Sequence, residues 1–507
     1  MNQAQDNIWQ RLDIRLCAVA VSLLVSLLNY WFPYPLNDDG FTFIRTAQIF
    51  QEQGLSAAIE HYPWAAYPLA IGLLSKLLAI ELMTAAYLLN AVFYALLVYA
   101  WLSIVREIDS SRILLALAAI VILVYPQLNE NRSEFIRDIG FVALVVTAIW
   151  QMIRFWHTRH MSNVVGFTLL LLLATSLRIE GLVYLLFTPW VFLLEGDKVL
   201  AIRFRTVAQF LLLSLVTLVI VVLLMSFSGY NLIQLALDFV STYVPFITET
   251  LFPSPDRAMA VATALFNDFA ANYSKEYILP ILLVALLIVL AGNLFNAVGG
   301  PFLLVILFGL AKKYATLPRR VALPVMTFML CNLVILFCFV FITRYLTSRY
   351  ALVFSTLLIL LVPVIMQRTL EWAGQIGQLR LIRPVLVIFL LYCAFDAYVS
   401  FGENKAYLHE AADWVRENSP PDTALLTNSN LIAFDSGRIA DYDMTERMIP
   451  AAQIIAAVPG TLIAVELNYA MVDMLAEARL ATRIDVAKEY FTGDELQLVV
   501  YRRNAEP

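Results

Sequence analysis

The chain has 507 residues, of which 61% are hydrophobic and 14% are charged, whereas soluble domains are about 45–50% apolar and about 25% charged. This composition excludes a soluble enzyme, a disordered protein and a nucleic-acid-binding protein, and it is typical of a polytopic membrane protein. The four cysteines all lie in apolar segments and are too few for a disulfide framework.

Eleven apolar stretches carry almost no charge, and most of them are long enough to cross a bilayer. They are expected to be helices rather than strands, because a backbone in hydrocarbon must satisfy its own hydrogen bonds. The stretches are 16–36, 83–105, 113–128, 139–153, 161–177, 181–194, 206–237, 277–311, 321–343, 351–367 and 384–401.

Lysine and arginine in the connecting segments predict the orientation, because basic loops stay in the cytoplasm. If the basic clusters are all cytoplasmic, the chain makes about eleven net crossings, with its N-terminus inside and its C-terminus outside. The segment 277–311 counts as one net crossing, although glycines and Pro301 interrupt it. The two long loops, 33–82 and 228–276, are then extracytoplasmic, and we expect the second to be a partly ordered lid or acceptor-binding loop.

Residues 402–507 differ from the membrane part, 1–401, because they carry 17 acidic and 9 basic side chains. We predict a small soluble α/β domain here. Its helix is expected over Ala406–Glu417, and its strands over Thr423–Thr427, Gly460–Val465 and Leu496–Tyr501.

An acidic pair, Asp38-Asp39, follows the first apolar stretch directly and precedes Gly40. Two adjacent carboxylates at a membrane surface raise the pKa of one of them, which suits a general base. The alternative is a turn that caps a helix over Phe41–Gln53. Further along this loop, His61 and Tyr62 are candidate substrate-binding residues, although aromatics at this depth also form interfacial belts. No second histidine lies nearby in the sequence, so no histidine-based metal site is predicted.

Three further charged clusters fall on the predicted outer face. Arg132, Arg137 and Asp138 belong to a dense charge run before the stretch 139–153. Arg178 and Glu180 divide two apolar runs, and an outside arginine needs either a structural partner or an anionic ligand. The sequence leaves both explanations open.

The last cluster contains two Arg-Tyr pairs, and the residues that we assign to it are Arg344, Tyr345 and Arg349. Two guanidinium groups with phenolic donors suit a phosphate or pyrophosphate. Snorkelling to ordinary lipid headgroups is the alternative.

Together, the acidic pair after the first helix, the Arg-Ile-Glu-Gly turn, the Arg-Tyr pairs and the run from Tyr407 to Asn418 resemble the integral-membrane glycosyltransferases of the GT-C superfamily. The nearest branch is the aminoarabinose-transferase and protein O-mannosyltransferase group. The chain lacks that branch's Lys-Pro-Pro run in the first loop and has His61-Tyr62-Pro63-Trp64 in that region, so the acceptor type stays open.

The resemblance implies inverting transfer of a sugar from a polyprenyl-phosphate donor to a lipid, glycan or protein acceptor outside the membrane. It implies that Asp38 is the base and that Asp39 assists it or binds a divalent cation. Arg344 and Arg349, supported by Arg178 or Arg137, would hold the donor phosphate. No other cofactor and no nucleic-acid partner are expected, and the implied location is a bacterial inner membrane with the site facing the periplasm. The alternative function is a non-enzymatic translocase or transporter of lipid-linked sugars, and a structural scaffold for an envelope polysaccharide complex is a third.

Overall fold

The computed structural model describes residues 12–32, 36–227, 254–399, 405–481 and 484–504, and also 234, 237–238, 240–241, 244–245 and 247–248. The fold divides into two compact units. The first, the helical unit, consists of 1–25, 91–131 and 137–399. The second, the mixed unit, consists of 26–90, 132–136 and 400–507, so residues of the first predicted loop pack with the C-terminal domain.

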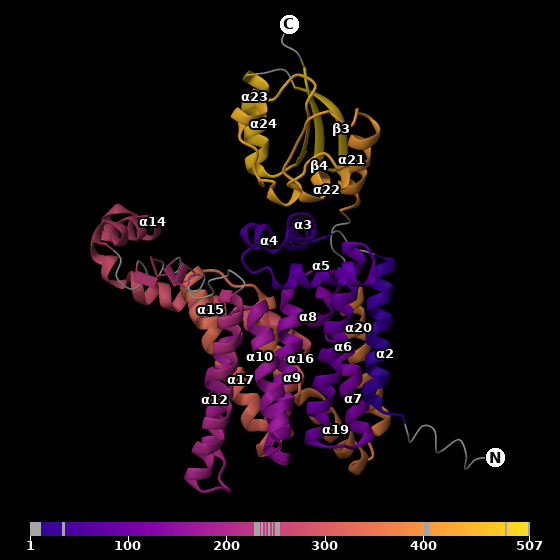
Figure 1. Cartoon of the computed structure of the whole chain (residues 1–507), viewed down its shortest axis with the longest axis vertical. Coiled ribbons are helices and arrows are strands. Elements are labelled where there is room, and N and C mark those ends of the chain that lie inside the picture. The colour runs from indigo at the N-terminus through magenta and orange to yellow at the C-terminus, as the bar shows by residue number, and fades with distance from the viewer. Residues whose placement is uncertain are drawn as a thin grey trace, which may run out of the picture. The chain divides into compact units, whose positions relative to one another are not determined.

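Long apolar helices make up most of the helical unit (Figure 1). Their positions follow the apolar stretches of the sequence, and most of the helices extend a few residues beyond them into polar ends. The helices are α2 (Ile14–Trp31), α6 (Leu82–Ile108), α7 (Arg112–Leu123), α8 (Pro126–Asn129), α9 (Arg137–Thr158), α10 (Met161–Leu177), α11 (Gly181–Phe187), α12 (Leu200–Phe227), α14 (Pro255–Ser274), α15 (Ile278–Val298), α16 (Gly300–Ala311), α17 (Arg319–Thr343), α18 (Leu352–Leu358), α19 (Leu361–Gln375) and α20 (Leu379–Tyr398).

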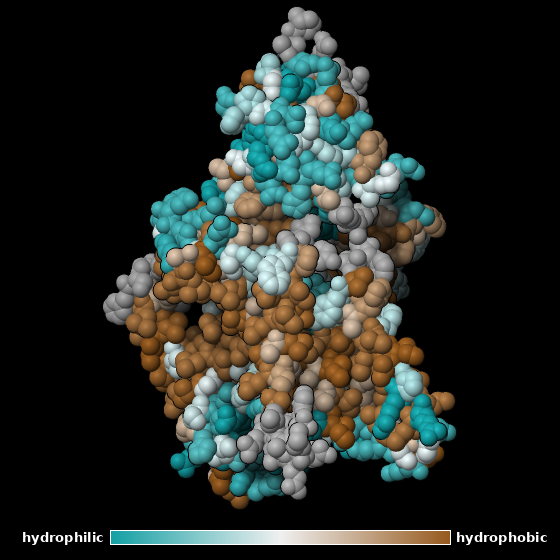
Figure 2. Space-filling view, turned by 90° about the vertical axis from the view of Figure 1, so that its right-hand side faces the viewer, coloured by the Kyte–Doolittle hydropathy of each residue, from teal (hydrophilic) through white to brown (hydrophobic). Residues whose placement is uncertain are grey.

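Among the described residues, eight helical segments are long and apolar enough to cross a membrane, or nine if the bent pair of α7 with α8 and the following 3₁₀ turn is one span. The surface of these helices is largely hydrophobic, as the brown belt in Figure 2 shows. Large apolar side chains exposed to this extent are stable in lipid but not in water. The chain is therefore an integral membrane protein, as predicted. The eleven net crossings and the orientation stay predictions.

Two of the predicted apolar stretches are broken helices. The stretch 113–128 bends by 53° between α7 and α8, where Pro126 starts the second helix. The stretch 277–311 divides at Gly299, whose φ of 80° ends α15 before Pro301 opens α16. A φ of this sign favours glycine because a side chain would meet the backbone. Both breaks follow from local residue chemistry.

The two loops that we predicted contain helices. Helix α3 (Asp38–Gln53) starts three residues before the expected segment 41–53, and it is followed by α4 (Leu55–His61) and α5 (Ala66–Leu78). In the second loop, α14 occupies Pro255–Ser274 with a kink at Asn267. Much of 228–253 lies outside the described residues, as do residues 33–35 and 402–404.

The C-terminal domain is a four-stranded sheet between two helical layers. Its strands are β1 (Leu425–Thr427), β2 (Leu462–Glu466), β3 (Ile484–Thr492) and β4 (Glu495–Arg503), in the order β1-β2-β4-β3. Only β1 and β2 are parallel. One face packs on α21 (Ala406–Glu417) and α22 (Asn430–Ser436). The other packs on α23 (Ala451–Ala456) and α24 (Tyr469–Ala481). The predicted helix and three of the strands are confirmed.

Alternation along the central strands explains why both faces of this sheet are covered. On β2, Leu462 and Ala464 point to one core, whereas Ile463 and Val465 point to the other. A strand with apolar side chains on both faces is stable only between two layers. The prediction missed β3, because this edge strand is mostly exposed and carries charged residues that protect a sheet edge from further pairing.

Candidate functional site

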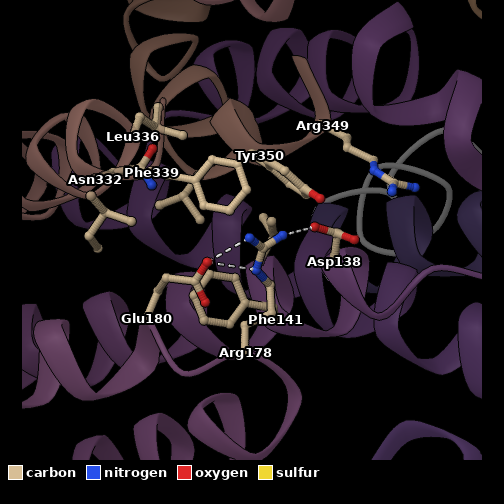
Figure 3. Close-up of a pocket in the computed structure, with 12 residues that line it drawn as sticks. Asp138, Phe141, Arg178, Glu180, Asn332, Leu336, Phe339, Arg349 and Tyr350 are labelled. Atoms are coloured by element: carbon tan, nitrogen blue, oxygen red, sulfur yellow. Dashed lines mark hydrogen bonds and ion pairs between the residues drawn. The ribbon is translucent and has the colours of Figure 1, made fainter. Parts of the chain in front are cut away.

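A partly buried ionic cluster in the helical unit brings together three of the charged segments singled out in the sequence (Figure 3). Asp138 comes from the first turn of α9, and Arg178 and Glu180 come from the turn between α10 and α11. Arg349 and Tyr350 come from a 3₁₀ turn, η4 (Ser348–Ala351). These elements lie far apart in the chain, so the cluster exists only in the folded unit.

Arg178 is the centre of the cluster. Its guanidinium forms ion pairs with Asp138 and with Glu180, the latter with Nη2 at 2.6 Å from Oε1. Its Nε also donates to the same Glu180 oxygen at 3.2 Å. The Tyr350 ring lies over the guanidinium, with its centroid 4.3 Å from Cζ. Of the two explanations for Arg178 that the sequence left open, the structural ion pair is therefore present.

Burial and neighbouring charges shift the pKa values of Arg178 and Glu180 in opposite directions. Burial alone raises the pKa of the Glu180 carboxyl, but the charge and hydrogen bonds of Arg178, with a smaller effect of Arg137, outweigh it and lower the pKa overall. Burial alone also lowers the pKa of Arg178, and the neighbouring carboxylates reverse that effect. Both groups are therefore ionised, and Arg137 is close enough to contribute to the field.

The second arginine of the cluster, Arg349, lines the same small pocket as Arg178 and Tyr350. Its Cζ lies 5.6 Å from the Tyr350 ring centroid, so one aromatic ring contacts two guanidinium groups. The amide of Asn332 also lines the pocket. The free volume is about 10 Å³, which is room for about one water molecule. An anionic group of a substrate would therefore meet the rim of this pocket rather than its interior.

Arg344 and Tyr345 lie outside the pocket lining. Arg344 ends α17 in a left-handed conformation, with a φ of 62°, and it is exposed. Tyr345 is also exposed and contacts Phe339 edge-on at 5.8 Å between ring centroids. The two Arg-Tyr pairs thus occupy different environments, and the structure groups only the second pair with Arg178.

The acidic pair lies in the mixed unit, in the first turn of α3. Asn37 is the residue before the helix, and it exchanges hydrogen bonds with the backbone of Phe135, accepting at 3.0 Å and donating at 3.4 Å. Carboxylates at a helix N-terminus are stabilised by its partial positive charge. The alternative of a capping turn before Phe41 is therefore wrong, because Asp38 and Asp39 lie inside the helix and Asn37 is its N-cap. This position does not exclude a role as base.

Asp38 also contacts two side chains of the C-terminal domain. Its Oδ2 lies 3.2 Å from Arg447 Nη2, and its Oδ1 lies 3.5 Å from Asn430 Nδ2. Sequence reasoning missed both partners, because about 400 residues separate them from Asp38 and neither belongs to a recognisable motif.

The candidate substrate-binding residues of the first loop have structural partners. His61 Nε2 lies 2.9 Å from Asp443 Oδ2 of the C-terminal domain. Tyr62 packs edge-on against Phe43, with ring centroids 5.6 Å apart. The side chain of Arg132 is buried and donates to Ser26 Oγ at 2.8 Å.

No group of three or more histidine, cysteine, aspartate or glutamate side chains that could hold a metal ion occurs within the ranges that the structure describes. Asp38 and Asp39 could contribute two carboxylates to a divalent cation, which prefers oxygen ligands. Asn332, in the lining of the pocket, is a further residue that the sequence analysis missed. An amide inside an otherwise apolar stretch is the signal that would have found it.

Comparisons with known proteins found little. No protein-family model matches the chain, and no curated protein sequence matches it. Among solved structures, it is similar to the archaeal oligosaccharyltransferase AglB from Archaeoglobus fulgidus, which was determined in complex with an inhibitory peptide and a dolichol-phosphate. The identity is 13%, the TM-score is 0.48, and the match covers 98% of this chain and 74% of that one.

Proposed function

We propose that this membrane protein is an inverting glycosyltransferase that uses a sugar linked to a polyprenyl phosphate. The observation that carries the proposal is the cluster of the buried Arg178 with the half-buried Arg349 and Tyr350 at the ends of apolar helices. A lipid-phosphate substrate would bring its charge to this kind of position, where the hydrocarbon ends.

The guanidinium groups of the cluster suit an anionic ligand. Arg178 and Arg349 line the pocket together with the carboxylates Asp138 and Glu180, and the charge of Arg137 also acts on Glu180. The guanidinium of Arg178 is occupied by its ion pairs with Asp138 and Glu180. Its proposed role is to hold these two carboxylates in place rather than to bind the donor. Arg349 and Tyr350 are the groups that would contact the donor phosphate, with Arg344 and Tyr345 nearby in sequence as a second, exposed contact. Charge-assisted hydrogen bonds to phosphate are among the strong ones.

Asp38 is the proposed base. It would take the proton of the acceptor hydroxyl while the acceptor oxygen attacks the anomeric carbon from the face opposite the phosphate. A new carbon–oxygen bond forms, the bond from the anomeric carbon to the phosphate oxygen breaks, and the electron pair leaves with the polyprenyl phosphate. The arginines would stabilise the charge that develops on this leaving group.

We further propose that Asp39 orients Asp38 or shares a divalent cation with it, and that His61, Tyr62 and Arg132 shape the surrounding loop. The acceptor is a lipid, a glycan or a protein. The loop charges favour an extracytoplasmic site, and a bacterial inner membrane with a periplasmic site fits that orientation. Labelling Asp422→Cys and Lys313→Cys variants with an impermeant maleimide in intact cells tests it, since only the first should react.

The test of function is transfer by the purified protein in nanodiscs, with labelled polyprenyl-phosphate sugars as donors and membrane extracts as acceptors. Asp38→Asn should abolish transfer and keep donor binding, whereas Asp422→Asn, at an exposed carboxylate of the C-terminal domain, should transfer like the parent. Arg349→Ala should weaken donor binding about tenfold or more, since a charged contact contributes about 1.5–3 kcal/mol, and Arg380→Ala should not. Adding a chelator decides the cation requirement.

Other outcomes would reject the proposal. Donor binding without transfer to any acceptor, unchanged by Asp38→Asn, would point to the translocase instead. Equal donor affinity of Arg349→Ala and the parent would remove the cluster from the donor site.

A further inference from the structure

The C-terminal domain holds the helix that carries Asp38. Phe41, one turn into α3, is buried in the same core as Tyr442 and Phe434 of that domain, with ring centroids 6.3 and 5.6 Å away. Helices α3 and α22 lie side by side in the mixed unit (Figure 1). An aromatic residue of the first loop is therefore part of the core of the C-terminal domain.

Polar contacts around this core fix the same arrangement. The Tyr442 hydroxyl donates to Gln48 Oε1 at 2.8 Å, and Arg45 pairs with Asp441 at 3.0 Å. The next residue, Asp443, is 0% exposed in its side chain and is paired with His61, which is 12% exposed. A buried charged contact is costly unless its partner is in place. The three consecutive residues 441–443 of the C-terminal domain thus each contact a side chain of α3 or α4.

Two residues close in sequence to 441–443, Asn430 and Arg447, contact Asp38, the proposed base. The Asn430 amide donates to Asp38 at 3.5 Å, and its own oxygen accepts from the Thr445 hydroxyl. The hydroxyl therefore orients the amide so that its nitrogen faces the carboxylate. Arg447 reaches the other carboxylate oxygen at 3.2 Å. The Arg447 and Asp38 side chains are 88% and 66% exposed, so a substrate hydroxyl can still approach the carboxylate.

We propose that Asn430 and Arg447 are positioning residues for Asp38, so that the C-terminal domain is a working part of the acceptor side of the active site. The inference rests on the proposed function, because Asp38 is the base only if the protein transfers a sugar. Arg447 contacts one oxygen of the carboxylate and Asn430 the other, so together they fix its rotation. Neither residue touches the reacting atoms.

A zero-length cross-link tests the contact without any activity. In the Arg447→Lys variant of the full chain in nanodiscs, a carbodiimide should join the new amine to the Asp38 carboxyl as an amide, and the carbodiimide takes up the water as a urea. Mass spectrometry of the digest identifies the joined peptides. Lys405 and Glu466, 3.4 Å apart, provide the internal positive control. An Arg416→Lys variant should give no link to Asp38, because Arg416 pairs with Asp413 instead.

Kinetics test the role. Arg447→Gln and Asn430→Ala should each lower kcat about tenfold and leave the KM for the donor unchanged, and Arg447→Lys should recover part of kcat. The matched control is Arg416→Gln, which removes another exposed arginine from an ion pair in the same domain. If these residues had only a structural role, the variants would yield less folded protein, but the folded fraction would have the parent's kcat and KM.

The cross-linking and kinetic experiments distinguish a failure of the proposed function from a failure of the positioning role of Asn430 and Arg447. If the parent transfers no sugar, the proposed function fails, and the role of Asn430 and Arg447 as positioning residues fails with it. If the parent is active, kcat values of Arg447→Gln and Asn430→Ala equal to that of Arg416→Gln overturn the inference alone. Absence of the Asp38 link while the link between Lys405 and Glu466 forms also overturns it. The Asp38 link together with the kcat loss supports it.

Discussion

Arg178 has a structural role at the proposed site. It pairs with two carboxylates, and one of them, Asp138, is buried with it. Its replacement leaves a buried negative charge without its partner, and such changes cost about 3–5 kcal/mol. Asp138 and Glu180 would then lose the cation that they share, which makes the cluster less favourable for an anion. At this position, stability and the proposed function depend on the same ion pairs.

We therefore expect Arg178→Ala to lower the thermal unfolding midpoint of the protein in detergent, measured by intrinsic fluorescence. Arg380→Ala, at an exposed arginine, should unfold like the parent. Equal midpoints for the two variants would mean that the Arg178 pairs add nothing to stability.

A second residue, His409, gives the C-terminal domain a pH dependence. A hydrogen bond with Asp435, with Nδ1 and Oδ2 2.7 Å apart, raises the pKa of His409 above its usual value. Since the pKa is higher in the folded state, the pair stabilises fully below the unfolded pKa of about 6.5. That contribution is lost as the pH rises through the folded pKa.

Thermal unfolding of His409→Gln should accordingly differ from the parent more at about pH 5 than at about pH 9. Asp435→Asn should show the same trend, because it removes the other partner. A difference that grows with pH would contradict this assignment.

At the scale of elements, Gly299 decides where the stretch 277–311 breaks. Besides its positive φ, a Cβ at this position would lie 2.7 Å from the Gln127 side chain. A residue forced into such a conformation costs about 1–3 kcal/mol. The break between α15 and α16 is thus specified by conformation and by close packing together.

Gly299→Ala should lower the unfolding midpoint, whereas Gly292→Ala within α15 should not, because nothing lies within 4 Å of a Cβ there. Differential scanning fluorimetry of the two variants gives the comparison. If both variants unfold alike, the break tolerates a side chain and the argument from Gly299 is wrong.

At the scale of the whole molecule, residues near the two ends of the chain share one core. Phe41 is 2% exposed and packs with α22, about 390 residues later. Truncating a buried aromatic side chain costs about 3–5 kcal/mol. Loss of the Phe41 ring should therefore reduce the protection of backbone amides from hydrogen exchange in both the first loop and the C-terminal domain.

In Phe41→Ala, amide hydrogen exchange should become faster in both α3 and α22, and it should stay unchanged in α9 of the helical unit. Phe269→Ala, which truncates a phenylalanine 80% exposed on α14, is the control for the loss of the ring. Faster exchange restricted to α3 would show that the two segments unfold independently.

The sequence alone determined the membrane class, the positions of the apolar helices and the limits of Ala406–Glu417. These features depend on local composition and periodicity, which each segment carries by itself. The edge strand β3 escaped this reasoning, because its exposed, charged residues lack the apolar signal of a buried strand.

The pairings were decided only by the tertiary structure. The sequence pointed to Asp38, Arg178 and Arg349 as candidate residues, and a pair of Arg178 with its neighbour Glu180 was one of its two explanations. It contained no signal that Arg447 and Asn430 meet Asp38, or that Asp138 also pairs with Arg178. Contacts between residues tens or hundreds of positions apart depend on how helices and sheet pack. The role of a charged residue depends on which side chains surround it in the folded protein, and a single sequence does not reveal partners that are distant in the chain.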